Sequence, residues 1–559
     1  MTSEVVWSTG SDVLDAMMGG GFPRQRVVAI TGGAGSGKTV LAAQVVAAQA
    51  ARGVSSVFVA FEQSSERVRA DLSGFAWARH LGDARVEIIE AGVPRHAVID
   101  GDFDLEALTT ILDATVQRLG AEIVVLDGVD ALLSMLGGED AERRELFRIG
   151  TWLRDNGLTG IVTAKSSATW ARSLERAAII DYQSDGVIAL DAMQSGTVVS
   201  RTLRVSKLRG TEHRGDVTPF VIDAEGLRVA YLPTVQRTAV ARSDHRLTSG
   251  VKTLDEMLQG GYLRGSATLI SGPPGTAKSS LAAAFVHASV GHENAVYVTF
   301  DESETELLFH MASIGYDLSE AMASGVLRLL ALRSGTAGPE RHMIEILAAV
   351  DELEASVVVI DPISAFNSGD HPFADLMTHH LFHELDRRGV TTVCTSLVSG
   401  TVSDEATKSQ ISTIADNWLH VTYLAHGGER NRALTVVKAR GTANSNQVRE
   451  LVISSEGVAL LPVFLSGGDV LVGAARAQHE ERERREEWER AVAFEQRRAA
   501  AQNDVDDLVA DLGRLERELT ARRDALADLD SLRQQELARD VSERAERKRT
   551  RNANMTGVS

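Results

Sequence analysis

The chain has 559 residues, of which 44% are hydrophobic, and 58 basic against 77 acidic side chains give it a formal net charge of −19. At roughly 100 to 200 residues per domain, this length predicts about three units rather than a single core. The acidic balance argues against a protein that lives on a nucleic-acid backbone. The single cysteine, Cys394, excludes an intramolecular disulfide and a multi-cysteine metal site.

The sequence also bears on the compartment. No apolar stretch approaches the roughly 18 residues that a membrane span needs. The N-terminus, MTSEVVWSTG, lacks the basic segment and apolar run of a signal peptide. Cys394 stands in TTVCTSLV, where we expect a buried small side chain in a reducing environment. We therefore expect a soluble, cytoplasmic protein.

The first motif lies in residues 27–40, VVAITGGAGSGKTV, where a short apolar strand leads through a glycine-rich loop into a helix. Gly32, Gly37, Lys38 and Thr39 fill the pattern G-x-x-x-x-G-K-[ST]. Its backbone N–H groups cradle phosphates, its lysine reaches the β- and γ-phosphates, and its hydroxyl binds Mg²⁺. The helix N-terminus adds a favourable dipole. The predicted nucleotide contacts are Gly33, Ala34, Gly35, Ser36, Gly37, Lys38, Thr39 and Val40.

A second loop of this kind lies in residues 267–281, ATLISGPPGTAKSSL. Ala277 stands where the pattern has the glycine before Lys278. An alanine fits if its φ is negative, whereas a site that needs a positive φ would be strained by it. The alternative is a degenerate loop that binds no nucleotide. The predicted contacts are Gly275, Thr276, Ala277, Lys278, Ser279 and Ser280.

The two loops belong to an internal duplication. Lys38 and Lys278 lie 240 residues apart, and Lys207 and Lys438 of two later Lys-x-Arg-Gly elements lie 231 apart. In each half, β-branched apolar runs alternate with amphipathic stretches, which predicts a mostly parallel α/β sheet flanked by helices, typical of RecA-like P-loop domains. We expect α/β domains at 1–238 and 245–466, a polar linker at 235–246 and an all-α coiled-coil tail at 474–552.

The tail is rich in Arg, Glu, Ala and Leu, which predicts a helix. Apolar residues recur at steps of three and four, and Arg522 interrupts them. Such a seam is typical of a coiled coil, and the alternative is a solvated single helix. We call the apolar positions of this row the tail seam: Val505, Leu508, Leu512, Leu515, Leu519, Leu526 and Leu529.

Phosphoryl chemistry at a P-loop needs a carboxylate that orients Mg²⁺ near the loop. Asp127 ends the apolar run IVVLD and Asp361 ends VVVID. We predict these as metal-orienting residues, together with the loop hydroxyls of Thr39 and Ser279. The alternative is that the two aspartates only form turns.

A carboxylate that takes a proton from the attacking water or hydroxyl is also required. After the run V-[AT]-F, the first half has Glu62 followed by Gln63, and the second half has Asp301 followed by Glu302. A glutamine cannot act as a base. The predicted bases are therefore Glu62, Asp301 and Glu302, and the alternative is that they cap strand ends.

These features together resemble the KaiC family of circadian clock ATPases and autokinases. The resemblance rests on the tandem loops, the S-x-G-x-x-x-L-D-x-M-x-x-G-G lead-ins, the paired polar residues and the Lys-x-Arg-Gly elements, and it covers about residues 5–465. It implies a homohexamer of two stacked rings with ATP and Mg²⁺ between subunits. It further implies slow hydrolysis in the first ring and, in the second, phosphorylation of a Ser-Thr pair across the interface.

The resemblance also implies site residues. An arginine offered by a neighbouring subunit stabilises transition-state charge and couples hydrolysis to assembly. The phosphoacceptors match Ser412 and Thr413, with Thr407 as a third hydroxyl, and the first half lacks this pair. Asn444 stands where the family has histidine. The expected contacts to a neighbour's nucleotide are Arg201, Lys207, Leu208, Arg209, Thr211, His213, Arg432, Lys438, Ala439, Arg440 and Thr442.

Two other functions stay open at this point. A RecA-like DNA motor would need basic loops, but the segment after Asp127, GVDALLSMLGGEDAERREL, has mixed charge and no interleaved aromatics. A nucleotide-gated scaffold would recruit an unidentified signalling partner without transferring phosphate. Typical family members end in a short tail, so the long tail departs from them, and we expect it to join subunits or two hexamers.

Overall fold

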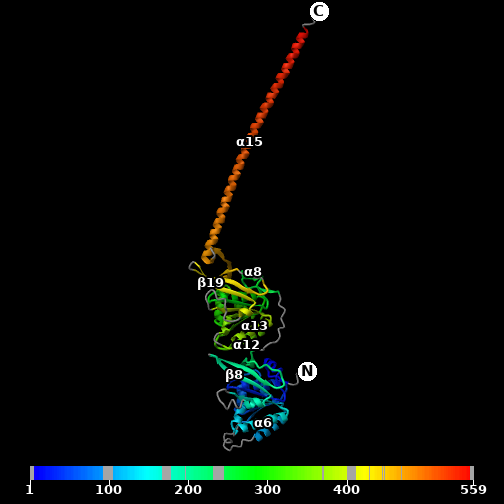
Figure 1. Ribbon diagram of the computed structural model, residues 1–559, viewed down its shortest axis with the longest axis vertical. Coiled ribbons are helices and arrows are strands. Elements are labelled where there is room, and N and C mark those ends of the chain that lie inside the picture. The colour runs from blue at the N-terminus through cyan, green and yellow to red at the C-terminus, as the bar shows by residue number, and fades with distance from the viewer. Residues whose placement is uncertain are drawn as a thin grey trace, which may run out of the picture. The chain divides into compact units, whose positions relative to one another are not determined.

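The computed structural model describes residues 6–91, 105–136, 138–166, 178–195, 197–230, 244–367, 371–398, 411–426, 429–442, 445, 447–466 and 469–553. By its internal contacts the chain divides into two units, Met1–Val463 and Phe464–Ser559. The first unit contains both nine-stranded sheets, and the second contains the long C-terminal helix (Figure 1).

The first sheet has the strand order β11-β10-β9-β8-β3-β7-β6-β4-β5. The strands from β8 to β5 are parallel, and β9 to β11 continue the sheet in antiparallel fashion. Its strands are β3 (Val27–Gly32), β4 (Ser56–Ala60), β5 (Val86–Glu90), β6 (Ile123–Asp127), β7 (Thr159–Lys165), β8 (Gly186–Ser195), β9 (Val198–Leu208), β10 (Thr218–Asp223) and β11 (Gly226–Val229), beside the short pair β1 (Val6–Trp7) and β2 (Phe22–Pro23). Its helices are α1 (Asp12–Met17), α2 (Lys38–Ala50), α3 (Ser65–Leu72), η1 (Ala78–Gly82), α4 (Leu105–Leu119), α5 (Val129–Leu133) and α6 (Glu139–Asp155).

The second sheet repeats this topology in the order β16-β15-β17-β18-β14-β19-β20-β21-β22, with β16 to β19 parallel and the rest antiparallel. Its strands are β14 (Ala267–Gly272), β15 (Ala295–Thr299), β16 (Leu327–Ala331), β17 (Val357–Asp361), β18 (Thr391–Leu397), β19 (Asn417–His426), β20 (Glu429–Ala439), β21 (Arg449–Ser454) and β22 (Gly457–Pro462), beside β12 (Arg246–Leu247) and β13 (Tyr262–Leu263). Its helices are α8 (Lys252–Met257), α9 (Lys278–Ser289), α10 (Glu304–Ser313), α11 (Ser319–Ala323), α12 (Pro339–Leu353), η2 (Ile363–Asn367), α13 (Ala374–Arg387) and α14 (Ile411–Ile414).

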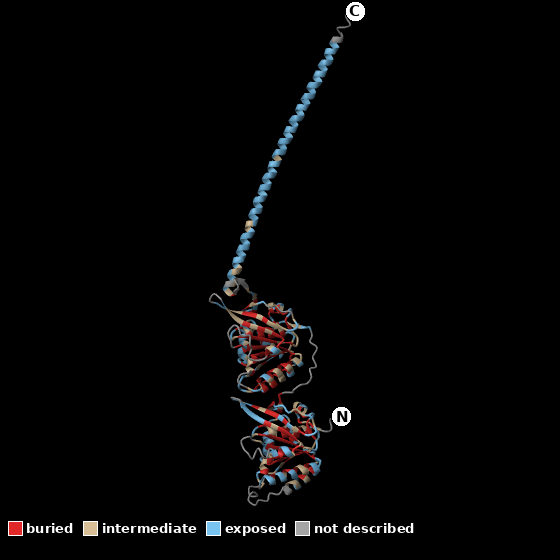
Figure 2. Cartoon of the chain, in the orientation of Figure 1, coloured by how far each residue is buried: buried red, intermediate tan, exposed pale blue. Residues whose placement is uncertain are grey.

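The central strands are buried on both faces, as a parallel sheet covered by helices requires (Figure 2). Successive side chains of a strand point to opposite faces. Val28 and Ile30 of β3 pack in one apolar cluster with α2, while Val27 and Ala29 pack in the other with α4 and α6. The predicted α/β class and the duplication are thereby confirmed.

The register of β9 decides which of its residues reach the P-loop. β3 runs toward its loop and β8 runs parallel to it, so the antiparallel β9 begins at the loop edge and ends at the opposite edge. Arg201 pairs with Ala192 late in β8, whereas Leu208 pairs with Gly186, the first residue of β8. The second sheet repeats this arrangement with β19 and β20.

The second unit consists of the hairpin β23 (Phe464–Ser466) and β24 (Asp469–Leu471), followed by the helix α15 (Gly473–Ala553). The predicted tail helix is thus confirmed as one continuous helix. Its residues are exposed along nearly the whole length (Figure 2), including the tail seam, where Leu508 is 64% exposed.

Within the described residues, no helix combines the length and the apolar character needed to cross a membrane.

Candidate nucleotide sites

The first glycine-rich loop connects β3 to α2, as the motif predicts, and α2 begins at Lys38. Gly37 adopts the left-handed conformation at φ 101°, and a Cβ atom there would lie 2.7 Å from Cδ1 of Ile222. Nζ of Lys38 donates to the main-chain oxygens of Gly32 at 2.9 Å and Gly33 at 2.7 Å. Burial lowers the pKa of Lys38, and the nearby Asp130 and Asp127 carboxylates oppose this shift. The ammonium therefore lies at the place where phosphates would meet the loop.

Asp127 ends β6 beside the hydroxyl of the loop. Oγ1 of Thr39 lies 3.1 Å from both carboxylate oxygens of Asp127, and Oγ1 of Thr163 donates to Asp127 at 2.7 Å. Burial raises the pKa of Asp127, and the bonds from Thr163 and Thr39 act against that rise. A hydroxyl and a carboxylate side by side are the oxygen ligands that Mg²⁺ takes at a P-loop. These two residues therefore fit the predicted metal.

The second loop connects β14 to α9, and its lysine repeats the contacts of Lys38. Nζ of Lys278 donates to the main-chain oxygens of Gly272 at 3.0 Å and Pro273 at 2.8 Å, and burial lowers its pKa. Asp361 ends β17 and accepts hydrogen bonds from Tyr297 at 2.9 Å and from Thr395. The alanine that replaces glycine adopts φ 76°, so the strained alternative applies to Ala277.

The predicted bases follow the strand beside each metal-orienting aspartate. In the first domain, Oε1 of Glu62 lies 2.6 Å from Nζ of Lys165. The position that corresponds to Lys165 at the end of β18 is Leu397. Burial, followed by the charge of Asp361, raises the pKa of Asp301. Glu62 of the first domain is therefore paired with a lysine, whereas the position of that lysine beside Asp301 in the second domain is a leucine.

Glu302 is the remaining candidate base, and its Oε1 lies 3.1 Å from Nδ1 of His310 on α10. Glu302 is partly exposed and directly follows Asp301 in the turn after β15. Asp301 and Glu302 thus stand at the P-loop edge of the second sheet, following β15 as the sequence predicts.

The expected contacts of Arg201 and Arg432 with a neighbour's nucleotide stay predictions, and within the single chain both side chains reach a P-loop. Nε of Arg201 donates to the main-chain oxygen of Gly35 at 3.4 Å, and Nε of Arg432 donates to that of Gly275 at 3.0 Å. Each arginine therefore lies against the loop of its own subunit. The physical reason is the strand direction, because β9 and β20 pass the loop edge before they reach the Lys-x-Arg-Gly elements.

The two lysines of those elements lie at the opposite sheet edge. Nζ of Lys207 donates to the main-chain oxygen of Asp181 at 2.6 Å, and Nζ of Lys438 donates to those of Ser412 at 3.0 Å and Ala415 at 2.8 Å. Burial lowers the pKa of both lysines, and the arginine two residues later in the chain acts in the same direction. In the single chain, Lys207 therefore donates to the segment before β8, and Lys438 donates to the segment before β19.

The arginines of the elements accompany the lysines. Nη1 of Arg209 lies 3.8 Å from Oδ1 of Asp185, and Nη2 of Arg440 donates to the main-chain oxygen of Thr413 at 3.0 Å. Among the other expected contacts, Leu208 is buried, Ala439 is half-buried, Nδ1 of His213 lies 3.3 Å from the main-chain oxygen of Thr211, and the Thr442 hydroxyl accepts from Arg246 at 2.9 Å. Thr407 and Asn444 lie outside the described residues.

Ser412 and Thr413 lie on α14, next to the start of the sheet rather than next to its loop. The main-chain N–H of Asp416 donates to the oxygen of Ala267, the first residue of β14, while the P-loop follows Gly272, its last residue. A strand of 6 residues at about 3.3 Å each separates the two ends by about 20 Å. The structure therefore brings together loop, metal-orienting carboxylate and base, and keeps the hydroxyl pair apart from them.

Sequence reasoning missed two threonines that hold the metal-orienting carboxylates. Thr163 and Thr395 are each the fifth residue of the neighbouring strand, and each donates to the aspartate of its half. The duplication could have revealed both threonines, because they stand at the same position of two equivalent strands, β7 and β18.

Comparison with known proteins agrees with this geometry. A family model described as the KaiC ATPase matches residues 7–233 and 247–463. The circadian clock protein KaiC2 of Synechocystis sp. (strain ATCC 27184 / PCC 6803 / Kazusa) is 32% identical over 477 residues, covering 84% of this chain and 83% of that protein. The circadian clock oscillator protein KaiC of Picosynechococcus sp. (strain ATCC 27264 / PCC 7002 / PR-6) is 30% identical over 475 residues, with 82% and 90% covered.

Proposed function

The chain belongs to the KaiC family of ATPases, and from this we propose that it is a ring-forming ATPase whose second domain phosphorylates Ser412 and Thr413. In this proposal the ring is a homohexamer with ATP bound between subunits. The observation that carries it is the separation of the two sheet edges. One edge holds the P-loop, and the other holds the acceptor hydroxyls and the Lys-x-Arg-Gly arm.

That separation supports assembly for a geometric reason. Phosphoryl transfer needs the γ-phosphate and the attacking oxygen in contact and roughly in line. A distance of about 20 Å along β14 prevents Ser412 from reaching the loop of its own subunit. We call the end of the sheet that carries the P-loop the loop edge, and the end that carries the acceptor hydroxyls and the Lys-x-Arg-Gly element the arm edge. A neighbour that docks its arm edge against the loop edge would bring its hydroxyls to the nucleotide. Lys438 and Arg440 would then reach the neighbour's nucleotide, and Lys207 and Arg209 would do so in the first domain.

In the first domain we propose hydrolysis. Lys38 and the loop N–H groups bind the phosphates, and Arg201 supports the loop from its own subunit. Glu62 orients the attacking water and takes its proton, which is the role of a positioned carboxylate. Thr39 and Asp127 would hold Mg²⁺, which would supply positive charge to offset the negative charge that develops on the phosphates.

In the second domain we propose transfer to a hydroxyl. The oxygen of Ser412 or Thr413 forms a bond to the γ-phosphorus as the bond to the β,γ-bridging oxygen breaks, and ADP leaves. The hydroxyl proton passes to Asp301 or Glu302. Lys278 holds the phosphates, and Ser279 and Asp361 would hold the metal.

The names of the two relatives connect them to the circadian clock. We propose that this chain likewise serves timing or signalling, with units at 1–238, 245–466 and 474–552. The tail would join subunits, or two hexamers, and would offer a surface to a protein partner. Net charge and the lack of interleaved aromatics support a protein partner over nucleic acid.

The test is intact mass after incubation with ATP and Mg²⁺. We expect about 80 Da per site, the mass of one phosphate, mapped to Ser412 or Thr413. Lys278→Ala should abolish the added mass, and the matched variant Lys38→Ala in the other loop should retain it. A wild-type protein that hydrolyses ATP for days and stays unmodified would replace this proposal with the nucleotide-gated scaffold.

A further inference from the structure

A polar cavity of about 320 Å³ lies at the arm edge of the second domain. His379, His383 and Asp386 of α13 line one side, and Thr413 and Arg440 line the other. His379 and His383 are four residues apart and so share one face of the helix. The cavity is far from the P-loop, because it also touches Ala267, where β14 begins.

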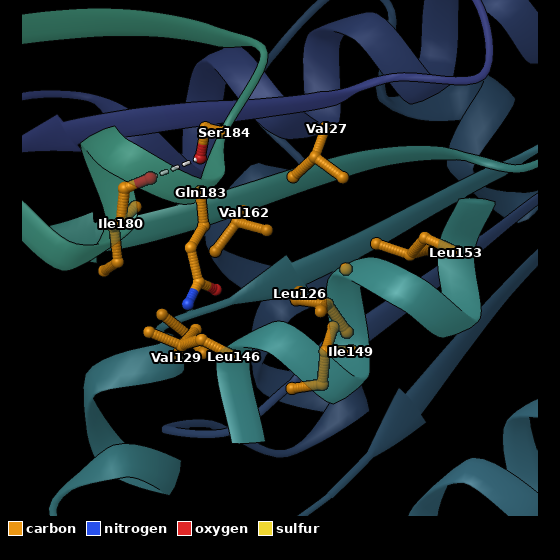
Figure 3. A pocket seen from close by; sticks show the side chains of 11 residues that line it. Val27, Leu126, Val129, Leu146, Ile149, Leu153, Val162, Ile180, Gln183 and Ser184 are labelled. Carbon is orange, nitrogen blue, oxygen red and sulfur yellow. Dashed lines mark hydrogen bonds between the residues drawn. The ribbon is translucent and has the colours of Figure 1, made fainter. Parts of the chain in front are cut away.

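The first domain has a different cavity beside its equivalent strand, lined by the core-facing side of α6. Val27 and Ala267 begin equivalent strands, and each accepts a main-chain hydrogen bond of 2.8 Å, from Asp185 and Asp416 respectively. Beside Val27, between α6 and the segment before β8, lies a void of only about 30 Å³ (Figure 3). Its lining is mostly apolar, with Leu126, Val129, Leu146, Ile149, Leu153, Val162 and Ile180.

Two polar groups of the smaller void donate to the main chain. Oγ of Ser184 donates to the oxygen of Ile180 at 2.7 Å, as Figure 3 shows, and Nε2 of Gln183 donates to that of Arg143 at 3.2 Å. The cavity next to the hydroxyl pair is about tenfold larger and is lined by ionisable groups of α13 and by Arg440. Its volume and its polar lining suit a charged ligand.

We propose that this cavity receives the phosphoryl group carried by Thr413, with His379 and His383 as its hydrogen-bond donors. The inference rests on the proposed autokinase activity only for the origin of the phosphate. Arg440 adds a positive charge beside Thr413, since its Nη2 donates to the main-chain oxygen of Thr413 at 3.0 Å. The ligand class is a phosphate monoester, which at pH 7 carries a charge of about −1.5 to −2 and three acceptor oxygens.

The charges around the cavity set a condition. Asp386 and Asp416 bring carboxylates, although Oδ2 of Asp416 accepts from the N–H of Ala267 at 3.1 Å. Lys438 lies behind α14 and contributes a positive charge. His380, next to His379, has its pKa lowered to about 4, first by burial and then by His383 and His379, so it stays neutral. Hydrogen bonds from His379 and His383, together with the positive charge of Arg440, must therefore offset the repulsion that these carboxylates exert on a phosphate.

The test uses the full-length protein with phosphothreonine incorporated at position 413 during synthesis, which bypasses the kinase step. Diethyl pyrocarbonate modifies the neutral imidazole, and peptide mass spectrometry reports the rate at each histidine. A phosphate that accepts a hydrogen bond from an imidazole occupies the nitrogen that the reagent attacks, so modification of that histidine should slow several-fold. We expect this slowing at His379 and His383, with His292, an exposed turn residue, unchanged as the control.

A second measurement follows removal of the phosphate by an added phosphatase. The double variant His379→Gln, His383→Gln should lose its phosphate several-fold faster than the parent, while His292→Gln should match the parent. Equal modification rates with and without phosphothreonine would overturn the proposal. So would equal protection of the unmodified protein by inorganic phosphate, which would make the cavity a site for a free anion. If the protein never phosphorylates itself, the proposed function fails but this test still gives its own answer.

Discussion

Nζ of Lys438 donates to the main-chain oxygen of Ser412 at 3.0 Å. A second bond from the same ammonium reaches Ala415 at 2.8 Å, so one side chain holds both ends of the short acceptor helix. Lys438→Met keeps the methylene chain and removes both bonds. At about 1 kcal/mol per hydrogen bond, the variant should be destabilised by about 1 to 2 kcal/mol. It should also phosphorylate more slowly.

Thermal unfolding and intact mass measure the two effects of Lys438→Met. Lys252→Met, at an exposed position of α8, is the matched control and should change neither. An unchanged unfolding temperature in Lys438→Met would show that the two bonds contribute nothing to the second domain.

Arg209 tests the arm edge of the first domain. It is 51% exposed and its ion pair with Asp185 is loose, at 3.8 Å, so little of the fold depends on it. If it reaches a neighbour's ATP, Arg209→Ala should lower ATP turnover at least about tenfold, because such arginines stabilise transition-state charge. The nucleotide-dependent ring should weaken as well. Light scattering with and without ATP measures the ring, and Arg52→Ala at an exposed position is the control. An unchanged ring with unchanged ATP turnover in Arg209→Ala would show that Arg209 does not act on a neighbour's ATP.

Ala277 offers a stability prediction in the second loop. Its φ of 76° costs an L-residue about 1 to 2 kcal/mol, whereas glycine loses only about 0.5 to 1 kcal/mol of flexibility. Ala277→Gly should therefore stabilise the second domain by about 0.5 kcal/mol. The reverse change, Gly37→Ala, should destabilise the first domain more, since its Cβ would also meet Ile222 at 2.7 Å. Denaturant unfolding of both variants checks this, and equal effects of opposite sign would show that the contact with Ile222 is harmless.

The pH dependence of phosphorylation identifies the base. Burial and the Asp361 charge raise the pKa of Asp301 above its ordinary 3.8. Only the ionised carboxylate accepts a proton, so the rate should fall on acidification through that raised pKa. The stabilising contribution of this group has the opposite dependence, since it is complete below the unfolded pKa and lost as pH rises through the folded one.

Asp301→Asn tests both predictions, because it removes the ionisation and keeps the shape. The variant should lose the acid limb of the pH–rate profile together with most of the rate. If Asp301→Asn phosphorylates like the parent at every pH, the proton goes to Glu302 instead.

The tail seam predicts self-association through α15. Its side chains are exposed in the single chain, with Leu512 at 59% and Leu515 at 60%, and its six leucines and one valine would bury enough apolar surface to pair helices. Deleting residues from Ala474 onward should reduce the mass of the assembly by more than the tail itself. Leu512→Glu should have the same effect in the full chain, and Ala510→Glu, on the outer face of the helix, should not. Mass photometry of the three variants measures this, and unchanged masses would indicate a solitary helix.

Much of each site was predictable because its parts are close in sequence. A P-loop is one contiguous strand, loop and helix, so Lys38 and Thr39 needed no tertiary information. Asp127 and Asp361 were found because an acidic residue after an apolar strand places itself at the same sheet edge as the loop. Thr163 and Thr395 were missed, since nothing local says that one strand's hydroxyl faces the next strand's carboxylate.

The sequence by itself determined the duplication, the two loops, the carboxylates that end two apolar strands and the helical tail, since each depends on residues that are neighbours along the chain or repeat at a fixed period. Only the tertiary structure decided that Arg201 lies against its own loop and Lys207 at the far edge, though both belong to β9. A strand of 11 residues spans the whole sheet, and its antiparallel direction assigns its two ends to opposite edges. Likewise, only the tertiary structure brought His379 and His383 of α13 to the same cavity as Thr413 and Arg440, because these residues lie on separate elements that helix packing and strand register bring together.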